Sequence, residues 1–235
     1  MVETTSTENP LAGTERTRVR RSPTRSVKER ESLHQIIDET MICHVGFVDK
    51  GHPFVIPTLG WRESNTLYIH GSRGSRMLKV FKDGGNACIT FTLLDGLVMA
   101  RSAFHHSANY RSAMILGCPK ILESKTEKLA ALEIFMELIA PARWDKLRET
   151  NSQEIEATDV LQLDMNEASV KVRTGDPIDD EEDLQHPVWA GIIPVKQVIG
   201  PMIPAQDCLV SEPAPDYSGA FDDRWIDTSL FPVRN

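Results

Sequence analysis

The sequence lacks cysteine pairs. Its four cysteines, Cys43, Cys88, Cys118 and Cys208, stand singly, and no C-x-x-C motif occurs. A zinc ribbon, a thioredoxin-like redox motif and a disulfide framework therefore lose support. Three of the cysteines lie in apolar, strand-like runs, where we expect small core residues of a protein from a reducing compartment.

The sequence also lacks long apolar runs, nucleotide-binding glycine loops and an excess of positive charge. No apolar run approaches the ~20 residues of a membrane span, and the beginning of the chain carries no apolar signal-peptide core. Neither G-x-G-x-x-G nor G-x-x-x-x-G-K-[ST] occurs, so a Rossmann site or a P-loop is not predicted. The net charge of −8 argues against binding to nucleic acid. We therefore expect a soluble, cytoplasmic protein.

The distribution of charge and proline divides the chain into three parts. Residues 1–24 are polar and aperiodic, and we interpret them as disordered or loosely attached. Residues 25–200 form the predicted folded domain, and residues 201–235, which are rich in proline, form a C-terminal extension. The acidic run at 176–183 is interpreted as a solvated, flexible segment.

Short runs with strand character fill most of the predicted domain. We expect the sheet to contain Ile42–Val48, Phe54–Leu59, Thr66–His70, Ala87–Leu94, Val98–Ala103, Ser112–Leu122, Val160–Leu163 and Ala168–Val172, with a hairpin or loop at Asp95-Gly96. Capping boxes at Ser26–Glu29 and Ser124–Glu127 open two predicted helices, the second of which runs to Ala140. A short helix is expected over Ser75–Lys82. Because strands do not alternate with helices, the pattern predicts a mainly β fold, an antiparallel barrel or sandwich.

Two segments concentrate groups that donate hydrogen bonds to phosphate and carbonyl oxygens. In His70-Gly-Ser-Arg-Gly-Ser-Arg76 a strand meets a short helix, and the glycines let the backbone approach a ligand. The second segment, Leu97–Ser112, is dense in Arg, Ser, His, Asn and Tyr. Each segment alone also fits an ordinary turn or a solvated strand surface. Together they predict a site for an anionic, oxygen-rich ligand such as a phosphate-bearing cofactor.

Two adjacent histidines, His105 and His106, raise the question of a metal site. Neighbouring side chains of an extended segment point to opposite faces, and no third ligand lies nearby in sequence, so no metal site is predicted. A histidine that hydrogen-bonds a cofactor or substrate is the better hypothesis. Trp189, beside Ala190 and Gly191, fits a planar ligand, a partner subunit or a core equally well.

Taken together, these residues resemble the pyridoxamine 5′-phosphate oxidase-like, FMN-binding split-barrel superfamily, and within it the flavin-nucleotide-binding group that includes Nim-type nitroimidazole-resistance reductases. The R-x-V-L-L-K phosphate motif of the vitamin-making oxidases is absent, so the resemblance does not imply that activity. The superfamily also has haem-degrading and deazaflavin-dependent members, so the resemblance does not decide the identity of the cofactor. The matching segments are Cys43–Phe47, Pro53–Thr58, Leu67–Ser72, Asp95–Ser107, Asn109–Ser112, Lys171–Gly175 and Trp189–Gly191.

The resemblance implies a six-stranded antiparallel split β-barrel that forms a homodimer with FMN at the subunit interface. It implies that one strand lies along the isoalloxazine ring, with Val55, Ile56, Pro57 and Thr58. It places the phosphate at the next strand and turn, with His70, Ser72, Arg76 and Lys79. The rest of the cradle would be Ser107, Tyr110, Arg111 and Ser112, with Trp189 from the second subunit.

The resemblance also implies an FMN-dependent oxidoreductase that reduces a small planar or electron-poor substrate, with NAD(P)H as direct or indirect donor. His105 or His106 would place a proton or hydrogen bond near the substrate, because the pKa of histidine lies near neutral pH. Two alternatives stay open: a non-catalytic flavin-binding module for storage or sensing, and a haem-binding split-barrel protein.

Overall fold

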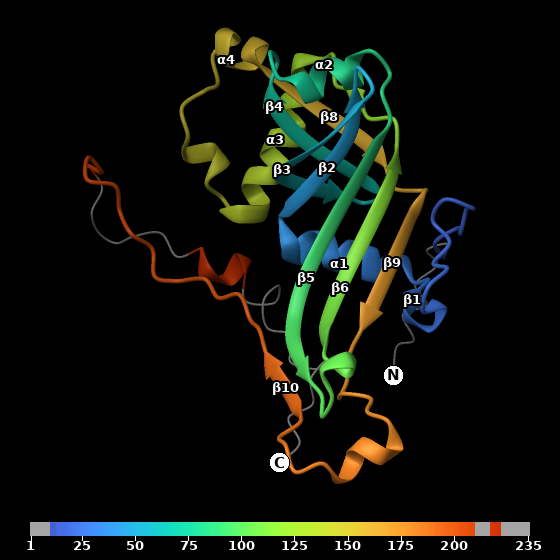
Figure 1. The fold of residues 1–235 in the computed structure, drawn as a ribbon. Helices are drawn as coiled ribbons and strands as arrows, with labels where there is room; N and C mark the ends of the chain where they lie inside the picture. Colours follow the sequence, from blue (N-terminus) through green and yellow to red (C-terminus); the bar gives the residue numbers. More distant parts are fainter. Residues whose placement is uncertain (1–9, 210–216, 222–235) are drawn as a thin grey trace, which may run out of the picture.

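The computed structural model describes residues 10–209 and 217–221, and its main feature is one antiparallel sheet that curls into a barrel (Figure 1). The strands are β1 (Ser26–Val27), β2 (Ile42–Asp49), β3 (His52–Glu63), β4 (Thr66–Ser72), β5 (Ala87–Met99), β6 (Ser107–Gly117), β7 (Lys120–Ile121), β8 (Thr158–Asp164), β9 (Ala168–Arg173) and β10 (Gly191–Pro194). The helices are α1 (Arg30–Thr40), α2 (Arg76–Lys82), α3 (Lys125–Ile139) and α4 (Ser152–Ala157).

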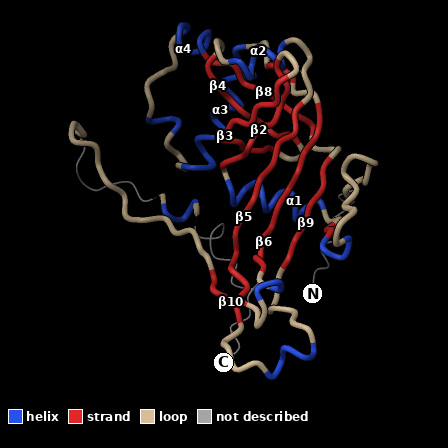
Figure 2. Tube along the Cα trace, viewed as in Figure 1, coloured by secondary structure: helices blue, strands red, loops and turns tan. Residues whose placement is uncertain are grey.

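The strands run in the order β1-β9-β6-β5-β2-β3-β4-β8-β7, and β10 pairs with β5 off this path. Figure 2 shows how strongly strands dominate the trace. The predicted mainly β, split-barrel fold class is confirmed. The predicted number of six strands is too low, since the sheet has 10 strands in the described part of the chain. The very short strands β1 and β7 and the late strand β10 lengthen the sheet beyond the expected barrel.

The barrel is split where β3 changes its pairing partner from β2 to β4. Residues 52–59 of β3 pair with β2, whereas residues 60–63 pair with β4. Beyond that point β4 pairs only with β8, through Ser72 opposite Thr158. Between Pro53 and Leu59, the edge of β3 that faces β4 therefore has no partner strand among the described residues.

The larger core fills the barrel and is closed by α1 and α2. The helix α1 crosses behind β5, β6 and β9 in Figure 1, and it buries Leu33, Ile36 and Ile37. It begins later than predicted, because Ser26 does not cap it. Instead Ser26 lies in β1 and pairs with Lys171 of β9.

A smaller core lies outside the barrel under α3. It contains Trp61 of β3, Val160 of β8 and Ala131 of the helix itself. The predicted start of α3 is confirmed, since the Ser124 side chain accepts a hydrogen bond from the backbone N–H of Glu127. The helix ends at Ile139, as the proline two positions further on predicts.

The predicted turn at Asp95-Gly96 is wrong, because β5 continues through it to Met99 with only a shift of register between Leu94 and Gly96. Gly96 instead allows β10 to approach β5 closely. A Cβ on Gly96 would lie 3.0 Å from a side-chain carbon of Ile192 and 3.1 Å from the carbonyl oxygen of Ile193, both in β10. The long ribbon of β5 and β6 turns only at residues 100–106, well below the barrel (Figure 1).

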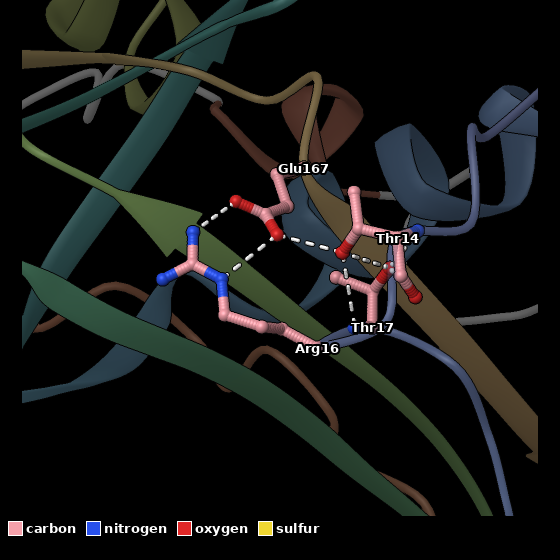
Figure 3. Close-up of polar contacts among 4 residues, drawn as sticks. All are labelled: Thr14, Arg16, Thr17 and Glu167. Carbon is pink, nitrogen blue, oxygen red and sulfur yellow. Dashed lines mark hydrogen bonds and ion pairs between the residues drawn. The ribbon is translucent and has the colours of Figure 1, made fainter.

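The described part of the N-terminal segment is pinned to the β8–β9 turn. Figure 3 shows Arg16 and Thr14 reaching the carboxylate of Glu167, with Thr17 bonded to Thr14. Leu11 is buried, and its backbone N–H donates to the carbonyl of Lys28 at 2.8 Å. Residues 1–9 of the predicted N-terminal segment, and 210–216 and 222–235 of the predicted extension, lie outside the described residues.

Candidate functional site

The open edge of β3 presents two kinds of side chain to two different faces. Thr58 lies opposite Cys43 and Ile56 lies opposite Val45, and both partners are fully buried. Cross-strand partners share a face, so Ile56 and Thr58 point into the barrel. Val55 alternates with them and points outward, with 66% of its surface exposed.

The backbone of this edge has donors and acceptors to offer. The N–H of Gly60 donates to the carbonyl of Met41 at 2.9 Å, so even-numbered residues of β3 direct their backbone groups toward β2. The odd-numbered residues then direct theirs to the open side. Pro53 and Pro57 have no N–H, which is why prolines are tolerated at this edge. The edge therefore displays the N–H of Val55 among carbonyl oxygens, a pattern that fits the polar rim of a planar heterocycle.

The β4–α2 turn lies beside this edge. If the β3–β4 register continued past Gly60 opposite Ile69, Pro57 would lie opposite Ser72. Ser72 is exposed, and Ser75 caps α2 by accepting a hydrogen bond from the N–H of Leu78. The predicted strand–turn–helix arrangement of this segment is confirmed.

Arg76 is the best-placed cation of the turn. Its guanidinium lies 4.3 Å from the centre of the Phe54 ring and 3.6 Å from the carboxylate of Asp49. These contacts fix its direction, yet 55% of its side chain stays exposed, so N–H groups remain available to a ligand. Lys79 follows one turn later on the exposed side of α2.

Tyr110 and Ser112 of β6 lie on the outward face of the sheet. Their cross-strand partners on β5 are Leu94 and Thr92, both of which are exposed. Ser112 uses its hydroxyl to donate to the carbonyl of Lys171. The structure thus brings these two residues to the same face as Val55 and Pro57.

Arg111 points the other way and is fully engaged. Its guanidinium pairs with Glu39 of α1 at 2.6 Å and with Asp95 of β5 at 2.9 Å. The hydrogen bonds and charges of these two carboxylates outweigh burial and raise its pKa further above the ordinary value. Arg111 therefore ties α1 to the sheet, on the face opposite the one that carries Tyr110.

The remaining predicted residues lie at the far end of the ribbon. From Thr90, the last residue that pairs with β2, β5 runs on to Met99, about 30 Å at the usual rise per residue. His105, His106 and Ser107 follow at the tip (Figure 1). The Trp189 side chain, 64% exposed, lies near the β10 end of the same ribbon. Within one chain these residues do not meet the open edge of β3.

The acidic run holds this tip in place, although the sequence pattern favoured a solvated segment. Asp179 pairs with the Arg101 guanidinium at 2.8 Å and also accepts a hydrogen bond from the Arg101 backbone N–H. His105 Nε2 lies 3.1 Å from the Asp180 carboxylate. His106 donates from Nδ1 to the carbonyl of Ser102. Both histidines thus have hydrogen-bond partners at the tip.

His70 lies apart from the phosphate-type turn, under α3. Its ring is 5.7 Å from that of Trp61 and 6.0 Å from that of Phe135. Its Nδ1 is buried and has no hydrogen-bond partner among the described residues. Burial lowers the pKa of His70 below its ordinary value, so the ring is neutral near pH 7.

The sequence interpretation missed His44. This residue is exposed on β2 and lies opposite Pro57, beside the open edge. The alternation of Cys43, Val45 and Phe47 as buried residues is the signal that places His44 on the outer face.

A small cavity of about 240 Å³ lies between α2, α3 and α4. The cations that line it include Arg73, which directly follows Ser72, and also Lys82 and Lys125. In the part of the chain that the structure describes, His, Cys, Asp and Glu side chains nowhere gather in threes to hold a bare metal ion. Among the same residues no helix has the length and apolar character needed to cross a membrane.

Comparison with known proteins gives a family and several solved structures. The family profile described as pyridoxamine 5′-phosphate oxidase matches residues 29–172. The flavocytochrome Anf3 of Azotobacter vinelandii is 41% identical with a TM-score of 0.83, over 86% of this chain and 94% of that one. An FAD and haem binding protein of Mycobacterium smegmatis is 32% identical with a TM-score of 0.78, over 84% and 97%.

A more distant match is a 5-nitroimidazole antibiotic resistance protein of Bacteroides thetaiotaomicron, 25% identical with a TM-score of 0.50, over 63% of this chain and 86% of that one. No curated protein sequence matches the chain.

Proposed function

The chain belongs to the pyridoxamine 5′-phosphate oxidase-like family, and from this premise we propose that it is a flavin-dependent oxidoreductase. The observation that carries the proposal is the unpaired edge of β3, with the cation-bearing β4–α2 turn beside it. The edge offers the backbone of Val55 to the ring, and the turn offers Ser72 and Arg76 to the phosphate. Tyr110 and Ser112 share the same face.

The residues present fit a flavin better than they fit a bare anion. A phosphate alone would need only the turn, whereas the open edge adds a flat backbone surface of the kind that binds a ring rim. Bound flavin supplies hydride and single-electron transfer, while the chain binds and orients it. Arg111, Ile56 and Thr58 are left out of the proposed site, because they point to the other face.

Between the two common flavins we propose FAD, whose first half is the FMN expected from the sequence. The Mycobacterium relative, which is 32% identical, binds FAD by its description. The cavity that follows the turn is lined by the cations Arg73, Lys82 and Lys125 and also by the carboxylates of Glu123 and Glu156, and its cations would meet a second phosphate. Chromatography of the cofactor released by acid separates the two flavins. Release of FMN alone would mean that the site binds one phosphate, at the turn, and that the cavity takes no part in cofactor binding.

We also propose that the working form is a homodimer that completes the site. The ribbon of β5, β6 and β10 leaves Leu94, Leu97 and Ile193 exposed, together with Phe104 at its tip. Apolar patches of this kind mark protein interfaces. A second copy laid along the ribbon would bring its own His105, His106, Ser107 and Trp189 toward the open edge of β3, which a single chain cannot do.

A second function, haem binding, is favoured by one specific observation. The two relatives with the higher identities are a flavocytochrome and an FAD and haem binding protein. The buried, unpartnered Nδ1 of His70 is the feature of this chain that fits such a group. We therefore propose a flavin and haem protein that is an oxidoreductase, with NAD(P)H as donor and a small electron-poor compound as acceptor, in which bound flavin would supply the hydride and electron-transfer chemistry.

Anaerobic spectroscopy tests the enzyme against a non-catalytic flavin module. The purified holoprotein is mixed with NADH or NADPH, and then with a panel of quinones and nitroaromatics. We expect bleaching of the flavin absorbance by a nicotinamide donor, and faster reoxidation by an acceptor than by dioxygen. If neither occurs, the oxidoreductase proposal is wrong and a storage or sensing module takes its place.

A further inference from the structure

We propose that His70 would hold the iron of a haem bound between β4 and α3. The inference rests on the proposed function, because it assigns a residue to the haem of that proposal. It concerns the outer face of β4, where His70 and Tyr68 point away from the barrel, in contrast to the buried Leu67 and Ile69.

The surroundings of His70 are aromatic and apolar. Trp61 and Phe135 lie beside its ring, at 5.7 and 6.0 Å between ring centres, and their own ring centres are 4.9 Å apart, so the three rings form one cluster. Tyr68 stacks on Trp61 at 6.0 Å, and burial is the main cause that raises its pKa. A porphyrin is a large apolar disc, and pockets that take such groups have walls of this kind.

The state of the imidazole suits iron. Burial keeps it neutral, and neutral imidazole is the form that binds a metal. Its Nδ1 has no hydrogen-bond partner in the described part of the chain, although it is buried. A buried polar atom without a partner costs free energy and calls for an explanation. Coordination of the iron at Nδ1 would supply that explanation.

The helix α3 is apolar beyond the face that it buries. Only Lys128 and Ala131 of this helix are buried. Its other large apolar side chains that pack toward the smaller core stay half-buried, namely Leu132, Ile134, Phe135 and Leu138. A helix with this much half-exposed apolar surface has a further apolar partner to cover. A haem on His70 covers it.

The other six histidines are less suited to the role. His34 lies within the large core, on the buried face of α1. His105 and His106 have hydrogen-bond partners at the ribbon tip. His44, His52 and His186 are exposed. Only His70 combines a buried nitrogen with two neighbouring aromatic rings among the described residues.

The two proposed cofactors would be neighbours. His70 and Ser72 are two residues apart on β4, about 7 Å along the strand. Alternate residues of a strand share a face, so the haem and the flavin phosphate would lie next to each other along the outer face of β4. This arrangement uses the same strand to hold both groups.

The test is reconstitution with hemin, followed by absorbance and electron paramagnetic resonance spectra of the wild type and of three variants. The wild type is expected to bind one haem per chain with a histidine-ligated spectrum. His70→Ala is expected to weaken hemin binding by more than the about 10–100-fold that loss of an outer-shell partner costs. His52→Ala, an exposed histidine on β3, is the matched control and is expected to behave as the wild type.

The outcomes separate the inference from the function on which it rests. A wild type that binds no haem removes the haem function. A wild type that binds haem, together with a His70→Ala variant of unchanged spectrum and affinity, overturns the role of His70 alone. If His70→Ala loses its flavin and its cooperative melting, His70→Gly with added imidazole decides: return of the wild-type spectrum supports the ligand, and failure to return overturns it.

Discussion

Arg76 is the residue on which the flavin proposal is most directly tested. Its guanidinium is held by Phe54 and Asp49 but is more than half exposed, so a bound phosphate would gain a charge-assisted hydrogen bond. Arg76→Ala is expected to weaken flavin binding by about 1.5–3 kcal/mol. A fluorescence titration of the apoprotein measures this loss. Lys120→Ala, an exposed cation on β7, is the control, and equal affinities for the two variants would exclude Arg76 from the site.

The cysteines differ in reactivity because only some of them are buried. Burial raises the pKa of Cys43 to about 12, and the thiolate is the reactive form. At pH 8 about one molecule in ten thousand would carry the Cys43 thiolate, since each pKa unit is a factor of ten. We expect iodoacetamide to label exposed Cys118 quickly and Cys43 only after unfolding in urea. Mass spectrometry that finds Cys43 labelled first in the folded protein would contradict the burial.

At the residue scale, the sequence predicted the donors that are close together along the chain. Ser72 and Arg76 lie in one turn, so local spacing was enough to place them beside each other. Arg111 could not be assigned in this way. Its partners are Glu39 and Asp95, and Glu39 lies on a helix that reaches it only through the tertiary fold. Strict alternation along β3 places Val55 and Pro57 on one face and Ile56 and Thr58 on the other. The sequence alone was sufficient to predict this division.

The N-terminal segment is an element whose attachment depends on one carboxylate. Hydrogen bonds from Arg16 and Thr14 hold the pKa of Glu167 below its ordinary value of 4.5. A lowered folded-state pKa means that the attachment is fully present above pH 4.5 and is lost as the pH falls through the folded-state value. We expect the protection of the Leu11 amide from hydrogen exchange to follow this profile.

The variant that isolates this effect is Glu167→Gln. It keeps the shape of the side chain but not its charge, so the Leu11 amide is expected to be less protected from exchange at pH 7, with little further change in protection toward pH 4. Arg20→Ala, which removes a contact between two exposed side chains, is the control. Undiminished protection in Glu167→Gln would mean that the segment is held by its apolar contacts alone.

The helix α3 is joined to β8 by a buried ion pair. Lys128 Nζ lies 2.9 Å from Asp159 and also donates to the carbonyl of Thr158. Asp159→Asn leaves a buried ammonium without its counter-ion and is expected to cost about 3 kcal/mol in the free energy of unfolding, measured in urea. The double variant Lys128→Met with Asp159→Leu is expected to recover most of that loss. A single variant as stable as the wild type would mean that water reaches the pair.

Elements whose ends carry local signals were predicted well. The cap at Ser124 and the proline after Ala140 bracket α3 in the sequence as they do in the structure. The Asp95-Gly96 pair has the same letters as a hairpin turn, but its glycine makes room for β10, which is almost a hundred residues away in the chain. Local patterns cannot distinguish a glycine needed for a turn from one needed for a close approach.

For the whole molecule, the proposed homodimer predicts that loss of the dimer weakens cofactor binding. Leu97→Glu places a charge on the exposed apolar side of the ribbon, and Ile193→Glu does so on β10. We expect either variant to elute as a monomer, to retain the β-rich circular-dichroism spectrum and to bind flavin more weakly, since half of the site would be missing. Leu147→Glu, also at an exposed apolar residue, is the control. A stable wild-type monomer that binds flavin fully would exclude a shared site.

The mainly β class and the split barrel were predictable because strand length, turn spacing and the family segments agree. The strand number was not, since β1 and β7 have two residues each and carry no periodicity that a sequence pattern can detect. The family resemblance predicted a site shared between two subunits, and this stays a prediction. His105 and Val55 are far apart in one chain, and the homodimer proposed above is what would bring them together.

The two prolines of the open edge have a consequence for the empty protein. An unpaired strand edge invites pairing with other chains and is a common origin of aggregates. Pro53 and Pro57 remove two of the N–H groups that an incoming strand would need, while the carbonyls remain for a small ligand. We therefore expect the protein without cofactor to be less prone to pair this edge with strands of neighbouring chains. Replacing both prolines with residues that carry an N–H would increase aggregation through the open edge of β3.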